Sequence, residues 1–151
     1  SRLFEKFTDW NLIIMGKGAL DEELKNQAIM LGIENKITFT GRVMDPYSVL
    51  YRCDIFVLSS RYEGFPNALL EAMVCGLPPV SFDCPSGPGE IIKHGVNGLL
   101  VPPGDVKALE ESLYVLMQDG GLRSNLGKEA IKVRKRFAID KIMKQWNKII
   151  T

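Results

Sequence analysis

The chain has 151 residues, which is enough for one domain with a hydrophobic core and too few for two. Apolar residues make up 46% and charged residues 25%, values that are typical of globular proteins and exclude a disordered chain. Nineteen Lys and Arg stand against eighteen Asp and Glu, and this net charge of +1 argues against a nucleic-acid partner. No apolar run is long enough for a membrane span.

The cysteine and histidine content indicates a protein without disulfides or metal. The three cysteines, Cys53, Cys75 and Cys84, are odd in number and form no C-x-x-C pair, which makes a disulfide framework or a structural zinc site a poor interpretation. A single histidine, His94, also argues against a histidine-based metal site. Buried thiols in a reducing cytoplasm are the simplest interpretation.

Short apolar runs alternate with segments of helical periodicity over the first hundred residues. From residue 105 onward the pattern is helical, with Asp105 as the expected start and an apolar face over 139–150. In chain order the pattern predicts a strand at 11–15, a helix at 21–31, a strand at 37–40, a helix at 46–52, a strand at 54–58, a helix at 67–75, a strand at 79–82, a helix at 89–93 and a strand at 99–101.

This alternation predicts an α/β fold with a doubly wound parallel sheet. The five strands are short and apolar without polar alternation, which suits strands covered on both faces. Right-handed β-α-β crossovers connect such strands, and ligands bind beyond their carboxyl ends. The loops at 16–18, 41–46, 59–67 and 82–89 are therefore the places to search for a site.

Charge is unevenly distributed along the chain. Nine basic and two acidic residues give 123–151 a charge of +7, which leaves −6 for the other 122 residues. A solvated helix face explains this basic segment most simply. Peripheral contact with an anionic membrane surface is the alternative.

The segment at 59–78 has the pattern strand, loop, helix, turn, strand, and it contains two carboxylates. Glu63 lies in the loop at the carboxyl end of the strand, and Glu71 lies in the following helix, which Asn67 is expected to cap. Gly64 permits close approach of a ligand, and the free N–H groups of the helix start attract phosphate. The carboxylates repel phosphate and suit the hydroxyls of a sugar or a ribose diol.

Two other interpretations of this pair stay open at this point. In the simplest interpretation, Glu63 and Glu71 are surface carboxylates near a helix start. Paired carboxylates are also typical of glycoside hydrolysis, although a phosphate-binding helix start between them favours transfer from an activated donor.

The motifs resemble the retaining GT-B glycosyltransferases, and specifically glycosyltransferase family 4. The resemblance covers nearly the whole chain, and its Cys84–Ile92 stretch is similar to the subgroup that builds bacterial surface polysaccharides and lipid-linked oligosaccharides from UDP-sugars. It is carried by Glu63-x7-Glu71 together with Phe39-Thr40-Gly41, Ser59-x-x-x-Glu63-Gly64-Phe65-Pro66, Leu70-Glu71-Ala72-Met73, Gly76-x-Pro78 and Gly98-Leu99-Leu100-Val101-x-Pro103-x-Asp105.

The resemblance implies roles for residues of the 59–78 segment. Glu63 is the expected catalytic residue and contacts hydroxyls of the donor sugar. Glu71 holds the ribose hydroxyls, and Gly64 with the main chain of Phe65 and Asn67 approaches the sugar and the diphosphate. The transfer retains anomeric configuration by front-face attack, so the protein positions the reactants and stabilises charge. No metal or other cofactor is expected.

The resemblance also implies contacts from the first third of the chain. The backbone of Arg42 and Val43 is expected to read the nucleobase, and Gly16 and Gly18 let the chain pass close to the nucleotide. Asp21 stands where a dinucleotide-binding fingerprint has its third glycine, so NAD is excluded as a ligand.

The resemblance further implies that residues 1–151 form one partial donor-binding domain, with 105–151 as its C-terminal helices. Nothing before Leu12 matches the family's first strand and basic diphosphate clamp, and residues 1–7 resemble the end of the helix that follows it. The acceptor, a glycan or a lipid-linked sugar, is read by an N-terminal domain, so the chain alone is expected to be inactive. A non-catalytic nucleotide-sugar-binding module and a sugar-nucleotide epimerase of the same fold are the alternatives.

Overall fold

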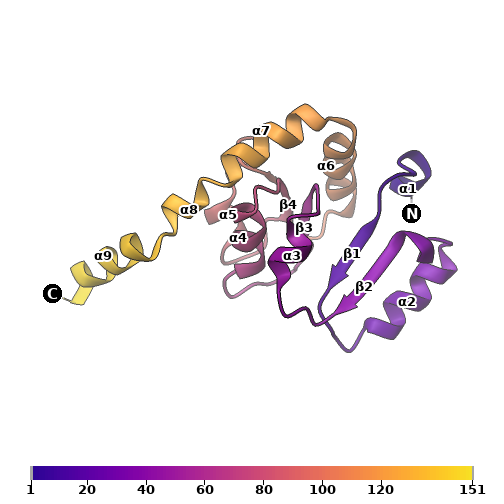
Figure 1. Cartoon of the computed structure of the whole chain (residues 1–151), viewed down its shortest axis with the longest axis horizontal. Helices are drawn as coiled ribbons and strands as arrows, with labels where there is room; N and C mark the ends of the chain where they lie inside the picture. The colour runs from indigo at the N-terminus through magenta and orange to yellow at the C-terminus, as the bar shows by residue number, and fades with distance from the viewer. Residues whose placement is uncertain (1, 151) are drawn as a thin grey trace. The chain divides into compact units, whose positions relative to one another are not determined.

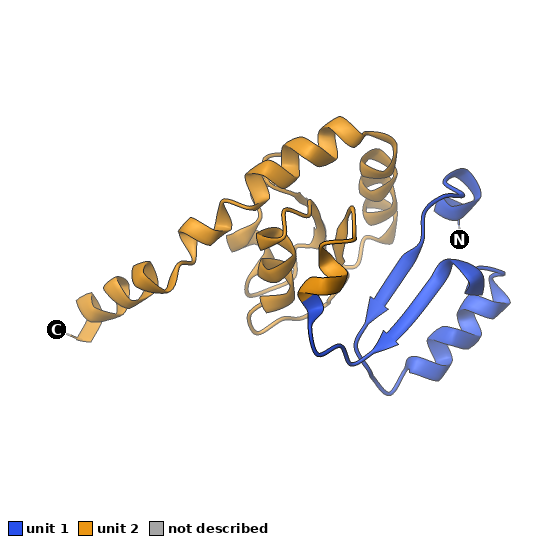
Figure 2. Cartoon of the chain, viewed as in Figure 1, with its two compact units in different colours: residues 1–46 blue, residues 47–151 orange. Residues whose placement is uncertain are grey.

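The computed structural model describes residues 2–150, and the chain divides into two compact units. The first comprises residues 1–46 and the second residues 47–151 (Figure 2). Each unit contains parallel strands and helices, and each is described by itself below. That 1–151 form a single domain stays a prediction.

The first unit is built on two parallel strands. Leu12 lies opposite Ile37, and the register shifts by one residue at the carboxyl end, where Met15 lies opposite Gly41. The Thr40 hydroxyl donates to the Gly41 carbonyl over 3.1 Å at this irregularity. In chain order the elements are α1 (Arg2–Lys6), β1 (Leu12–Met15), α2 (Asp21–Met30), the 3₁₀ helix η1 (Glu34–Lys36) and β2 (Ile37–Gly41) (Figure 1).

The second unit contains a three-stranded parallel sheet of order β3-β4-β5. The central strand β4 is buried at all four positions. In chain order the elements are α3 (Pro46–Leu50), which begins at the last residue of the first unit, then β3 (Phe56–Leu58), α4 (Asn67–Val74), β4 (Pro79–Phe82), α5 (Pro88–Ile91), β5 (Leu99–Val101), α6 (Val106–Gln118), α7 (Gly120–Ala130), α8 (Val133–Arg136) and α9 (Ile139–Ile150).

Helices cover both faces of this sheet. One apolar cluster contains Leu69 and Met73 of α4, and Leu100 of β5 packs against it. The other contains Leu116 of α6, and Leu99 packs against that one. Because successive side chains of a strand point to opposite faces, Leu99 and Leu100 identify the two covered sides.

The α/β class and the five parallel strands are confirmed, and the strands are hydrogen-bonded as one pair and one triplet. The bounds of β4 and β5 are those expected from the sequence. Asp105 begins α6 as predicted, because its Oδ1 accepts the Ala108 N–H over 2.9 Å. No helix within 2–150 is long and apolar enough to cross a bilayer.

The C-terminal helices differ in how they pack. α7 places Leu126, Gly127 and Ala130 in the core, whereas none of the residues of α9 is buried. The Arg134 guanidinium of α8 donates to the Val74 carbonyl over 2.6 Å, which ties α8 to the end of α4. The apolar face expected over 139–150 is therefore present on a helix that contributes nothing to the core of its unit.

The contact of α7 with the turn before β4 depends on a glycine. A Cβ at position 127 would lie 2.3 Å from the Gly76 carbonyl oxygen, far inside van der Waals contact with backbone that cannot rotate away. We expect Gly127→Ala to lower the free energy of unfolding by about 1–3 kcal/mol, the usual cost of overpacking a core. Urea unfolding followed by circular dichroism measures this change.

The matched control is Gly120→Ala in the same helix. Its added Cβ would meet nothing closer than the Arg123 guanidinium at 3.5 Å, and Ala has the higher helix propensity. Gly120→Ala should therefore leave stability unchanged or raise it slightly. Equal stability of the two variants would contradict the close packing of α7.

Candidate functional site

The loop between β3 and α4 and the helix that follows it contain the two predicted carboxylates. Glu63 lies in the loop and Glu71 in the second turn of α4, and both side chains are half-buried. Among residues 2–150, neither carboxylate has a hydrogen-bond or ion-pair partner. Two half-buried carboxylates without partners have their acceptor oxygens available for hydroxyl groups of a ligand.

The start of α4 differs from the expectation. Asn67 was predicted to cap the helix, and this is wrong: Pro66 holds the N-cap position and no side chain caps the helix. The Pro66 carbonyl accepts the N–H groups of Leu69 and Leu70, so the helical ladder begins one residue earlier. The Asn67 side chain is exposed on the first turn, and the Ala68 N–H has no acceptor within the described residues.

The loop after β4 packs against the loop after β3. A Cβ at Gly87 would lie 2.4 Å from Cδ of Pro66, and Gly87 has φ +136°, so only glycine fits there. Burial raises the pKa of the Cys84 thiol, and the negative charge of Glu63 raises it further. Through the contact of Gly87 with Pro66, the two loops form one surface at the carboxyl ends of β3 and β4.

Phe65 is held by the C-terminal helical segment. Its ring meets the ring of Phe137 edge-on, with centroids 6.2 Å apart and planes at 63°. The Arg136 guanidinium lies 5.0 Å from the centroid of Phe137. Phe65 is still 48% exposed, and its carbonyl accepts the Asn67 N–H over 2.9 Å at the helix start.

The first unit has a cavity of about 390 Å³ at the carboxyl ends of β1 and β2. It is lined by Gly16, Lys17 and Arg42. Two of the four residues predicted for this part of the chain, Gly16 and Arg42, are thus brought together. Val43 is half-buried and does not line the cavity.

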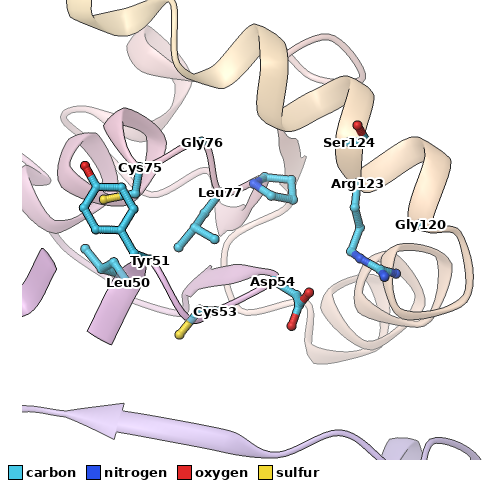
Figure 3. A pocket seen from close by; sticks show the side chains of 11 residues that line it. Leu50, Tyr51, Cys53, Asp54, Cys75, Gly76, Leu77, Gly120, Arg123 and Ser124 are labelled. Atoms are coloured by element: carbon cyan, nitrogen blue, oxygen red, sulfur yellow. The ribbon is translucent and has the colours of Figure 1, made fainter. Parts of the chain in front are cut away.

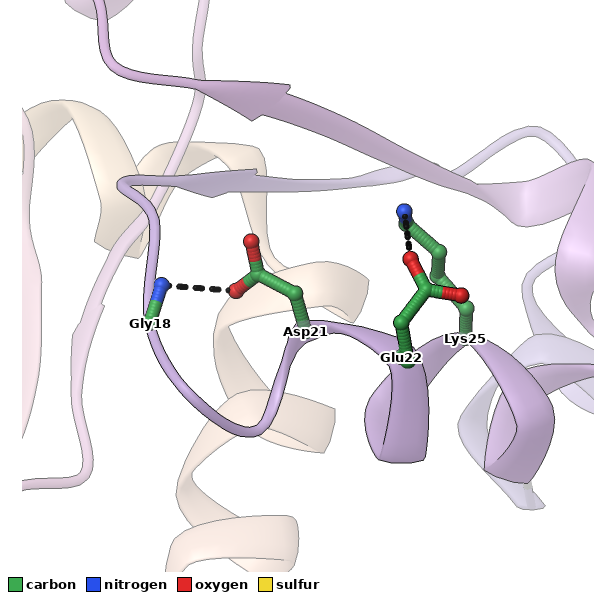
Figure 4. Close-up of polar contacts among 4 residues, drawn as sticks. All are labelled: Gly18, Asp21, Glu22 and Lys25. Carbon is green, nitrogen blue, oxygen red and sulfur yellow. Dashed lines mark hydrogen bonds and ion pairs between the residues drawn. The ribbon is translucent and has the colours of Figure 1, made fainter.

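Gly18 is engaged within its own loop. Its N–H donates to Oδ1 of Asp21 over 2.8 Å at the start of α2 (Figure 4). In the next turn, Lys25 donates to Glu22 over 2.7 Å, and this hydrogen bond raises the pKa of Lys25. The Gly18 amide is therefore occupied within its own loop, and its proximity to a nucleotide stays a prediction.

A second cavity, of about 320 Å³, lies in the second unit at the amino ends of the strands (Figure 3). It is lined by residues that precede β3 and β4, including Asp54 and Pro78, and by Cys53 and Cys75. Burial raises the pKa of both thiols, which makes them poor nucleophiles. This cavity therefore lies at the other end of β3 and β4 from the loops of Glu63 and Cys84.

Sequence reasoning missed several residues of these sites. Lys17 was not singled out, because a lysine in a loop has no distinctive signal. The Cys84–Ile92 stretch was noted for its resemblance, but nothing local indicated that Gly87 packs on Pro66. No group of three His, Cys, Asp or Glu suited to a metal ion occurs within 2–150.

Comparison with known proteins identifies the family. Residues 1–133 match the family described as glycosyl transferases group 1. An exopolysaccharide phosphotransferase of Streptomyces coelicolor is 39% identical over 143 residues, which cover 94% of this chain and 15% of that protein. The chain spans less than half the length of the first curated relatives it matches, from 15% to 44%.

Solved structures show the same fold. A structure of the Anabaena protein HepE in complex with UDP-glucose matches with a TM-score of 0.83 and 29% identity, over 93% of this chain and 40% of that one. The C-terminal domain of a group 1 glycosyl transferase from Francisella tularensis matches with a TM-score of 0.78 and 27% identity, over 90% of this chain and 73% of that one. The chain belongs to the glycosyl transferases of group 1, glycosyltransferase family 4, and it corresponds to the C-terminal domain of such GT-B enzymes.

Proposed function

We propose that this chain is the donor-binding domain of a retaining glycosyltransferase that uses a UDP-sugar. Glu71 accepts the two ribose hydroxyls, and Glu63 faces hydroxyls of the transferred sugar. The observation that carries this proposal is the pair of half-buried carboxylates, both without partners within 2–150, beside a helix start that has an unused N–H. The match to a protein solved with UDP-glucose supports the choice of nucleotide.

The parent enzyme then transfers a hexosyl or N-acetylhexosaminyl group to a glycan or lipid-linked acceptor of the bacterial surface. The relative in Streptomyces coelicolor, whose name refers to exopolysaccharide, supports this setting. In the proposed reaction the leaving phosphate takes the acceptor proton while the new bond forms on the same face of the sugar. The chain's residues therefore hold and orient the donor, and no metal or cofactor takes part.

Removing one carboxylate tests the ribose contact. Glu71→Ala deletes both acceptor oxygens, and losing a charge-assisted hydrogen bond costs about 1.5–3 kcal/mol. We expect UDP to bind roughly ten- to a hundredfold more weakly. Isothermal titration calorimetry with UDP and with UDP-glucose measures the change.

The control for this experiment is Glu111→Ala in α6, where an exposed carboxylate lies 3.8 Å from the Lys107 ammonium. It should bind UDP as the unaltered chain does. Unchanged affinity in Glu71→Ala would contradict the assignment of the ribose to Glu71, and an equal loss in both variants would show a nonspecific effect of charge.

The proposal assigns the acceptor, the first strand and the basic clamp to segments outside these residues. The 151-residue chain should therefore bind donor and release no UDP from UDP-glucose or UDP-N-acetylglucosamine in the presence of a bacterial lipid extract. A coupled assay for UDP, with chromatography of the sugar nucleotides, gives the result. Sustained UDP release contradicts the prediction, and a converted sugar nucleotide would favour an epimerase.

We also propose that α9 binds an anionic membrane surface. Trp146 is 57% and Ile149 77% exposed on its apolar face, and Lys141, Lys144 and Lys148 alternate with that face. Such a helix suits the interface of a bilayer, and the charge of +7 over 123–151 attracts acidic headgroups.

Vesicle sedimentation tests the membrane contact. The chain should pellet with phosphatidylglycerol vesicles at low salt and stay in solution with phosphatidylcholine alone. Ile149→Glu should abolish binding, whereas Val106→Glu, on an equally accessible apolar position of α6, should not. Absence of binding would contradict the membrane contact. A dimer in light scattering that Ile149→Glu dissociates would show instead that α9 packs against a second copy of the chain.

A further inference from the structure

We propose that Phe137 is a positioning residue for the nucleotide-sugar donor, because its ring holds the donor loop, residues 59–66 between β3 and α4. The inference rests on the proposed function, since it explains how the loop that carries Glu63 is kept in place. It also extends that function to a residue of the C-terminal helical segment, which acts through Phe65 and not by touching the donor itself.

The donor loop has little polar support. Among residues 2–150, none of 60–64 has a hydrogen-bond or ion-pair partner. The Phe65 carbonyl accepts the Asn67 N–H over 2.9 Å, but this contact stays within the same segment, and no side chain caps α4. A segment without polar contacts keeps its position only through packing. Side-chain packing must therefore fix the donor loop.

Two packing contacts supply this support at the end of the loop. Pro66 is fully buried and lies against Gly87 of the next loop. Phe65 meets the ring of Phe137 edge-on, with the ring centroids 6.2 Å apart. Because Phe65 follows Glu63 by two residues, the ring contact supports the part of the loop that carries the carboxylate.

Phe137 is itself firmly anchored. Its N–H donates to the Val133 carbonyl over 2.9 Å at the end of α8, and Val133 is buried in the apolar cluster of α4. The Phe137 side chain packs against the same cluster, since α8 lies against α4 (Figure 1). The Arg136 guanidinium, 5.0 Å from the ring centroid, adds a cation–π contact. The ring is therefore a fixed support for the loop.

The contact acts on the loop more than on α4. Leu69, Ala72 and Met73 of this helix are completely buried, so the core fixes α4 and the Glu71 that it carries. Loss of the Phe137 ring should loosen the donor loop and leave Glu71 in place. A loosened loop must be ordered by the ligand, which weakens binding of the sugar and diphosphate but not of the ribose.

Substitutions that remove or keep the ring test this role. Phe137→Leu should weaken UDP-glucose binding about two- to tenfold, the range that an edge-to-face pair contributes, and leave uridine binding unchanged. Phe137→Tyr keeps the ring and should retain UDP-glucose affinity. Isothermal titration calorimetry measures UDP-glucose, and a ¹⁵N NMR titration measures uridine. Full UDP-glucose affinity in Phe137→Leu, or an equal loss in Phe137→Tyr, overturns the inference.

The matched control is Phe56→Leu. Phe56 packs against the same apolar cluster as Phe137, but it begins β3 and so lies at the other end of that strand from the donor loop. Phe56→Leu should lower stability in urea as Phe137→Leu does, and it should bind UDP-glucose normally. An equal loss of UDP-glucose affinity in both variants would show a general loosening of the core and overturn the inference.

A double-mutant cycle tests whether Phe137 acts through Phe65. Because the two rings form one contact, Phe65→Leu combined with Phe137→Leu should bind UDP-glucose no more weakly than the more affected single variant. Losses that add in the double variant contradict the proposed route.

Glu71→Ala separates this inference from the proposed function, because it should weaken UDP-glucose and uridine alike. A loss in Glu71→Ala with full affinity in Phe137→Leu leaves the donor-binding function standing and overturns the positioning role. ¹⁵N relaxation without ligand gives a second criterion: Phe137→Leu should increase backbone motion at Glu63 and Gly64. Unchanged motion contradicts this inference alone, whereas no UDP-glucose binding by the unaltered chain contradicts the proposed function.

Discussion

The parallel pairing of β3, β4 and β5 is the constraint on which the second unit depends. β4 is buried along its whole length between two partners, so the three strands must end at one edge of the sheet. The loops that follow β3 and β4 are then forced into contact there. Gly87 makes this contact possible, because any side chain at that position would collide with Pro66.

Local patterns predicted the strands and most of the helices, and they predicted the ends of only some of these elements. The apolar runs of β4 and β5 predict the bounds of these two strands directly. Asp105 caps α6 because its side chain accepts the N–H of Ala108, three residues further along the chain. The start of α4 was misjudged because Asn67 is a common capping residue, whereas a proline carbonyl had already accepted the first helical hydrogen bonds. Helix α7 was not predicted as a separate element, since three glycines weaken its pattern and tertiary packing at Gly127 stabilises it instead.

The parts of the site that sequence reasoning missed depend on contacts between distant segments. No local pattern distinguishes Lys17. It lines the same cavity as Arg42 because Gly16 and Gly41, the residues before them, form a bridge. The Gly18 amide is engaged by Asp21 three residues later, and a close approach of the chain to the nucleotide at Gly18 stays a prediction. Residue types and spacing thus predicted where the loops are and which carboxylates they contain, and only the folded backbone showed which groups are left without partners.

The net charge of +1 is the sum of acidic and basic side chains that have different roles. A nucleotide-sugar has neutral hydroxyls at its ribose and sugar and negative charge at its diphosphate. Carboxylates bind hydroxyls well and repel phosphates, while cations do the reverse. A donor site must therefore keep the two kinds of group apart. Within residues 2–150, Glu63 and Glu71 have no hydrogen-bond or ion-pair partner, and both belong to residues 47–151. The pair Glu63 and Glu71 therefore suits the hydroxyl-bearing parts of a nucleotide-sugar and disfavours its phosphates.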